Sequence, residues 1–143
     1  MSLLERRAWL ALWSMCPPYA VYFAVQTVLP GRSGTMWERI GWLAAAAAIH
    51  LTVFAAGSLW FRAREGRGDG VFTDERDLAI EARACRSAYQ LLLFGAVGAG
   101  MMLPFKAAGW QIVNASLMFI VLAEMLRNGL IVHGYRGGAQ LAR

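Results

Sequence analysis

A few polar side chains inside long apolar stretches are the residues of this sequence that could do chemistry. Tyr19 and His50 both lie near the middle of such a stretch, where a polar group is costly and is a functional candidate by default. The His50 imidazole could relay protons, bind a metal or ligate a haem iron, and it could equally bond to a neighbouring helix. His133 is the only other histidine and lies at a different depth, so we expect no haem held by two histidines of one chain. The residues assign no cofactor.

A second group combines a carboxylate, a guanidinium and an amide in another apolar stretch. Glu124, Arg127 and Asn128 share one face of a helix, since they are spaced by three and four residues. As an ion pair between packed helices, this group would fix the fold. As a gate or a coupling site, it would release Arg127 when Glu124 takes up a proton.

Two adjacent prolines, Pro17 and Pro18, lie at the middle of the first apolar stretch. Proline lacks an amide donor and clashes with the carbonyl four residues earlier, so we expect a kink or a break there. Transporters build midplane binding sites from broken helices, whereas a simple kink serves packing.

A charged stretch between the apolar ones carries an acidic stripe. Asp74, Asp77 and Glu81 share one helix face at i, i+3 and i+7, and Arg83 and Arg86 lie away from it. The stripe could bind a divalent cation weakly or dock a basic partner. The simpler alternative is a solvated face with salt bridges to the Arg-rich tails. Because a metal site needs ligands from other segments, we predict no metal here.

The elements that must position these groups are membrane-spanning helices. Of the 143 residues, 58% are hydrophobic and 16% are charged, and the mean hydropathy is +0.44. Soluble domains carry about 25% charged residues, so lipid is the expected solvent. A spanning helix needs roughly 20 apolar residues, and four stretches meet this length, at about 8–29, 40–61, 87–105 and 107–132.

These stretches predict an all-α fold, a four-transmembrane-helix bundle of two antiparallel hairpins in a single membrane domain over 1–143. Residues 62–86 would form a cytoplasmic segment. Nothing breaks a helix strongly between residues 74 and 103, so the third helix would extend into the cytoplasm. Small residues suit close helix contacts, either within the bundle or with a second copy of the chain. They are Gly41, Ala45 and Ala48 in the second span, extended by Thr52, and the pair Ala96 and Gly100 in the third, with Gly95 and Gly98 beside it.

Arginine and lysine are unevenly distributed, which predicts the orientation. Ten lie in the two tails and in residues 62–86, and three lie in the opposite loops. Short loops rich in Lys and Arg stay in the cytoplasm, so we expect both termini there, in a bacterial inner membrane. The net charge of +5 reflects this bias, because residues 62–86 balance their arginines with as many acidic residues. We therefore expect the lipid bilayer as a partner and no nucleic acid.

The charged segment also carries a resemblance. Asp74-Glu75-Arg76-Asp77, followed by Ile80, Arg83, Arg86 and Ala88-Tyr89, resembles the DERD-type signature of an uncharacterised family of small bacterial four-helix membrane proteins. Further matches are Trp9, Tyr22-Phe23, Ala123-Glu124-Met125-Leu126-Arg127 and Tyr135-Arg136. The resemblance implies the same topology and does not suggest an activity. Gly137-Gly138 departs from larger members, which often carry a second basic residue there, and implies a weaker contact with lipid head groups.

Three functions are compatible with these residues. The acidic stripe and the arginines suit a regulatory or interaction module that docks a cytosolic or membrane protein. Pro17-Pro18, His50 and Glu124-Arg127 suit a polar path in a small homodimeric transporter or channel, and a kinked core suits a sensor of apolar molecules. We predict the regulatory, interaction or sensor module, with the transporter or channel as the alternative. We predict no enzyme, because the sequence holds no Gly-rich phosphate loop, HExxH, CxxC or Ser/His/Asp arrangement.

Overall fold

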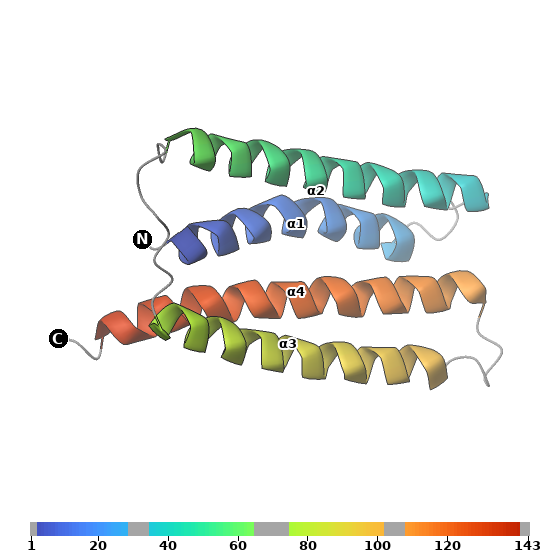
Figure 1. Ribbon diagram of the computed structural model, residues 1–143. Coiled ribbons are helices and arrows are strands. Elements are labelled where there is room, and N and C mark those ends of the chain that lie inside the picture. The colour runs from blue at the N-terminus through green and yellow to red at the C-terminus, as the bar shows by residue number, and fades with distance from the viewer. Residues whose placement is uncertain (1–2, 29–34, 65–74, 102–107, 141–143) are drawn as a thin grey trace. The chain divides into compact units, whose positions relative to one another are not determined.

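Four α-helices make up most of the described part of this computed structural model, which covers residues 3–28, 35–64, 75–101 and 108–140. In chain order they are α1 (Leu3–Val28), α2 (Met36–Arg64), α3 (Glu75–Met101) and α4 (Gly109–Gln140) (Figure 1). The prediction of an all-helical chain is confirmed over these residues. α1 and α3 begin before their predicted spans, α2 extends beyond its span at both ends, and α4 ends after its span, because helical hydrogen bonding continues into the polar flanks.

Three of the helices are long and apolar enough to cross a membrane, over Leu4–Gln26, Met36–Arg64 and Gly109–Arg136. Only 6% of the most apolar window of α2 is buried, and Trp37, Leu51 and Leu59 on it are exposed. Apolar surface of this extent indicates a membrane location. The predicted span 87–105 ends among residues 102–107, outside the described part of the chain, so it stays a prediction.

Two compact units divide the chain, one over Trp9–Val71 and the other over Met1–Ala8 with Phe72–Arg143. The first holds α2 and most of α1, and the second holds α3 and α4. The prediction of a single membrane domain concerns the assembly of the two units and stays a prediction.

In the first unit, α1 continues as one helix through Pro17 and Pro18. Its ribbon is unbroken and arched (Figure 1). Helices in apolar surroundings commonly accommodate prolines by bending, and α1 curves without a break. Leu10 packs on Gly57 of α2, so closely that a Cβ on Gly57 would lie 2.4 Å from Leu10 Cδ1.

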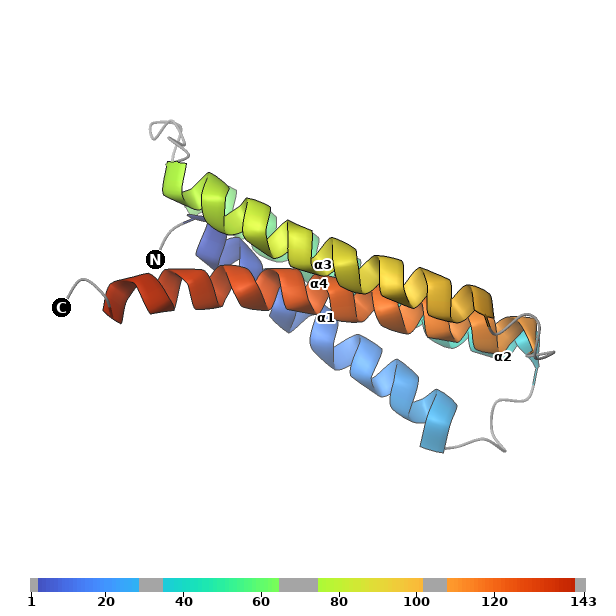
Figure 2. The same ribbon diagram turned by 90° about the horizontal axis from the view of Figure 1, so that it is seen from below.

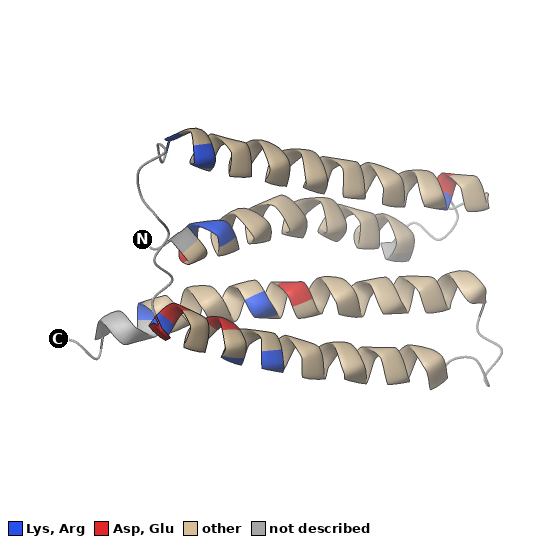
Figure 3. Cartoon of the chain, viewed as in Figure 1, with Lys and Arg blue, Asp and Glu red and all other residues tan. Residues whose placement is uncertain are grey.

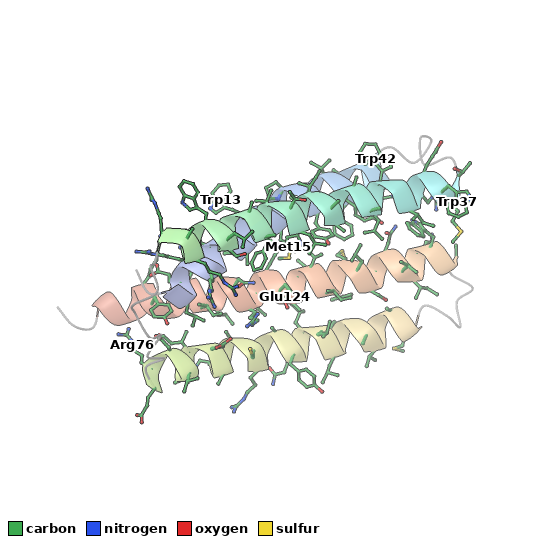
Figure 4. The ribbon with its side chains drawn as sticks, turned by 45° about the horizontal axis from the view of Figure 1, so that its top comes forward. Trp13, Met15, Trp37, Trp42, Arg76 and Glu124 are labelled. Atoms are coloured by element: carbon green, nitrogen blue, oxygen red, sulfur yellow. The ribbon has the colours of Figure 1, made fainter. Side chains whose placement is uncertain are left out.

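Exposed tryptophans occur on both helices of this unit, and two of them, Trp37 and Trp60, lie near the ends of α2. Trp13 on α1 is 71% exposed, and Trp37, at the N-terminal end of α2, is 79% exposed (Figure 4). The Arg64 guanidinium lies 5.2 Å from the centroid of the Trp60 ring at the other end of α2. Amphipathic rings at helix ends are typical of the two faces of a bilayer.

In the second unit, small residues allow α3 and α4 to pack closely, and both views show the two helices side by side (Figures 1 and 2). The buried residues of α3 are Ala84, Ala88, Gly95 and Ala99. Gly95 faces Phe119, and Gly134 faces Ile80. The small pair that the sequence suggests, Ala96 and Gly100, is exposed. The packed row therefore lies one residue earlier, on a face that receives the Phe119 ring.

The charges of this unit gather at one end. On α3 they precede Ser87, and on α4 they begin at Glu124. The remainder of both helices, toward residues 101 and 109, carries no charged side chain among the described residues (Figure 3). The groups that could do chemistry in this unit therefore lie near the start of α3 and in the C-terminal half of α4.

Candidate functional site

Arg127 of α4 is the centre of a polar cluster that joins α4 to α3. Its Nη2 donates to Glu81 Oε1 at 2.9 Å, and its Nε donates to Cys85 Sγ at 3.3 Å. Glu81 and Cys85 are one turn apart on α3, so a single planar guanidinium reaches both. The Glu81 and Arg127 side chains remain about one third exposed, at 35% and 33%. We call Glu81, Cys85, Glu124, Arg127 and Asn128 the Arg127 cluster.

Glu124 and Asn128 complete this cluster from α4. Arg127 Nη1 lies 3.7 Å from Glu124 Oε2, which is a weaker contact than the one to Glu81. Asn128 is buried, and its Nδ2 donates to the Glu124 main-chain oxygen at 2.8 Å and to Glu124 Oε2 at 3.5 Å. The sequence places Glu124, Arg127 and Asn128 on one face, and the structure brings them together. It adds Glu81 as the stronger partner of Arg127.

A second polar link lies close to the start of α3. The Tyr135 hydroxyl donates to Asp77 Oδ1 across the two helices. Two residues of the acidic stripe, Asp77 and Glu81, are thus both bonded to α4, and Asp74 lies outside the described residues. Arg83 and Arg86 are exposed. One signal in the sequence could have indicated these contacts. Asp77, Glu81 and Cys85 recur every four residues, next to the small residues Ala84 and Ala88, which are buried.

Loss of the Tyr135 hydroxyl gives the first testable prediction. Tyr135→Phe removes the donor to Asp77, so we expect the free energy of unfolding to fall by about 1 kcal/mol. Equilibrium unfolding of the purified protein in detergent measures it. Tyr89→Phe is the matched control, because Tyr89 on α3 is 60% exposed, and it should leave the free energy unchanged. An equal loss in both variants would show that the link to Asp77 contributes nothing specific.

His50 and Tyr19 belong to the other unit and meet as aromatic rings. The ring centroids of Tyr19 and His50 are 5.8 Å apart with the planes at 73°, and those of His50 and Phe54 are 6.3 Å apart at 68°. Edge-to-face packing of this kind joins α1 to α2. Over residues 3–28, 35–64, 75–101 and 108–140, no group of three or more His, Cys, Asp or Glu side chains could hold a metal ion.

An apolar cavity of about 280 Å³ lies beside the two prolines in the same unit. Pro17, Pro18 and Tyr22 line it from α1, and Trp42, Ala46 and Ile49 line it from α2. Its lining suits an apolar molecule, in keeping with the sensor alternative, and offers no charged group. Among the described residues, charged side chains lie in the α3–α4 unit and near the ends of α1 and α2.

Comparison of the chain with protein-family models, with curated proteins and with solved structures gave no match. Membership of the family with a DERD-type segment stays a prediction from the sequence. Proposals on function therefore rest on the contacts and the exposed faces of the four helices.

Proposed function

We propose that this chain is a four-span protein of the bacterial inner membrane that acts as a regulatory or interaction module. Both termini are cytoplasmic in this proposal, and the spans form two antiparallel hairpins. The ten-to-three distribution of Lys and Arg supports the orientation. Contacts that join Ile80 to Gly134 and Phe119 to Gly95 support the antiparallel course of the second hairpin.

The observation that carries the proposal is an exposed face at the start of α3. This face, which we call the α3 outer face, lies away from α4 and recurs at spacings of three and four residues. Leu78 on it is 56% exposed, on the stretch predicted to project into the cytoplasm. Leu78, Ala82 and Tyr89 form an exposed apolar row flanked by charges, and such a row is typical of a protein-binding surface. The α3 outer face comprises Glu75, Leu78, Ala82, Arg86 and Tyr89.

The polar groups of the α3–α4 unit favour a rigid interaction module rather than a transport path. Arg127 holds Glu81, Cys85 and Glu124, and Asn128 is bonded to the Glu124 backbone. A proton or ion path needs groups that can exchange partners along an open route. Here the same groups tie the projecting start of α3 to α4, which makes the α3 outer face a rigid platform.

Site-specific photocrosslinking in cells tests this proposal. A photoreactive residue at position 78 should give an adduct of one discrete protein mass. The matched control is position 97, because Val97 is also on α3 and 64% exposed but lies in the predicted span, and it should give no protein adduct. Leu78→Asp, which puts a charge on the α3 outer face, should reduce copurification of the crosslinked protein at least tenfold.

A measurement of proton flux tests the alternative proposal of a transporter. Proteoliposomes that contain a pH-sensitive dye and carry an imposed membrane potential should show no more flux than empty liposomes. Flux that is lost in Glu124→Gln and His50→Ala, together with no adduct at position 78, would replace the interaction module by a transporter.

A further inference from the structure

A groove of about 260 Å³ lies between α3 and α4, on a different face from the Arg127 cluster. Arg76, Arg83 and Ser87 line it from α3, and His133 lines it from α4. Arg76 and Arg83 are two turns apart, so their guanidinium groups lie on the same side of α3. The charged side chains that line the groove are all basic. Ser87 and the His133 imidazole add further hydrogen-bonding groups.

The arginines of the groove are not neutralised by the acidic residues of α3. Asp77 is bonded to Tyr135, and Glu81 is bonded to Arg127. Over the described parts of the chain, Arg76 and Arg83 have no ion pair with a carboxylate. Two such guanidinium groups on one face can neutralise a phosphate group, and the planar fork of each can donate to two phosphate oxygens.

The floor of the groove is apolar. Ile80 and Ala84 of α3 and Leu130 of α4 line it, and Gly134 lets the two helices approach. A Cβ on Gly134 would lie 2.9 Å from Ile80 Cγ2, so the glycine is needed for this approach. A phosphate alone would leave this floor uncovered, whereas a ligand with both a phosphate and a hydrocarbon chain would cover it.

The position of the groove along the helices also fits a lipid. Leu130 and Gly134 lie in the last two turns of the candidate span Gly109–Arg136. On α3 the groove reaches Ser87, where the predicted third span begins, and Arg76 lies at the N-terminal end of the helix (Figure 4). In the proposed membrane placement this is the depth of the cytoplasmic head groups, where basic residues attract anionic lipid.

We propose that the groove binds one anionic phospholipid of the cytoplasmic leaflet. Its phosphate lies against Arg76, Arg83 and His133, and the first part of an acyl chain lies against Ile80, Ala84 and Leu130. The inference rests on the membrane placement proposed above and is independent of the α3 outer face and of any protein partner.

Native mass spectrometry of the full chain in a non-ionic detergent tests this site. The chain is titrated with dioleoylphosphatidylglycerol and, separately, with dioleoylphosphatidylcholine. We expect one phosphatidylglycerol to bind more tightly than phosphatidylcholine. Arg76→Gln with Arg83→Gln should weaken phosphatidylglycerol by roughly 25-fold, a factor of about five for each arginine.

The matched control is Arg62→Gln with Arg86→Gln, which removes the same charge from exposed positions that do not line the groove. This control should keep the affinity of the wild type, and glycerol phosphate, which lacks acyl chains, should fail to displace the lipid. Equal weakening in both double variants would reduce the effect to general charge attraction and overturn the site. Equal binding of the two lipids would overturn it as well, and displacement by glycerol phosphate would make the groove a site for free phosphate compounds. A negative result for lipid binding would not contradict the interaction module, which the crosslinking at position 78 tests separately.

Discussion

Replacing Gly95 with alanine is expected to lower the free energy of unfolding by about 1–3 kcal/mol. Gly95 is buried where α3 meets α4, and a Cβ on it would lie 2.2 Å from Phe119 Cγ and 2.3 Å from Phe119 Cβ. These atoms are near the root of the Phe119 side chain, so the ring cannot swing aside without moving the helix. Equilibrium unfolding in detergent, followed by circular dichroism, measures the loss.

Gly98 supplies the control for this substitution on the same helix. A Cβ on Gly98 would meet no atom within 4 Å, so Gly98→Ala should be neutral or should stabilise α3 by up to about 1 kcal/mol through helix propensity. Phe119→Leu in the Gly95→Ala background should recover little of the loss, because leucine keeps the Cβ and Cγ atoms that the new methyl group would meet. A similar loss for Gly95→Ala and Gly98→Ala would contradict the close packing of α3 on α4.

Replacing Arg127 with methionine should have the second large effect, a loss of about 1–3 kcal/mol in the free energy of unfolding. Breaking a fully buried ion pair costs about 3–5 kcal/mol, and the partial exposure of Glu81 and Arg127 reduces this value. Methionine keeps an apolar chain of similar reach, so the loss reports on the guanidinium. Without the guanidinium that pairs with both carboxylates, the negative charges of Glu81 and Glu124 repel each other.

A double-mutant cycle with Glu81→Gln separates this contact from other effects. We expect a coupling energy of about 0.5–1.5 kcal/mol between positions 81 and 127, as for polar contacts between helices in a membrane. Arg86→Met is the control, because Arg86 is exposed and lies outside the Arg127 cluster, and it should have almost no effect. A coupling energy of zero would mean that the contact at 2.9 Å does not stabilise the helix pair.

Local patterns in the sequence were enough to predict the helices and the partners within one helix. The apolar stretches predicted all four helices, because each is long enough for a bilayer and few charges interrupt it. The spacing of Glu124, Arg127 and Asn128 predicted that they share a face, and they do lie together. The length of the apolar stretches decides the first of these results, and helical periodicity decides the second.

Contacts between helices were harder to predict, because periodicity does not fix the rotation of one helix against another. The sequence offered the Arg-rich tails as partners of the acidic stripe, and the structure bonds Asp77 and Glu81 to Tyr135 and Arg127 instead. Likewise, a shift of one residue turns a helix by about 100°, which separates the buried Gly95 from the exposed Ala96. The size and position of Phe119 on α4 select between these two faces.

The gathering of charges at one end of α3 and α4 makes the two ends of this helix pair respond to different conditions. At the charged end, the helices are held by Coulomb attraction and hydrogen bonds, which salt can screen. At the other end, they are held by contacts such as Gly95 with Phe119, which ionic strength does not touch and which hydrocarbon chains can replace. Salt concentration thus affects the strength of the contacts between α3 and α4 at one end. The packing of the surrounding acyl chains affects it at the other.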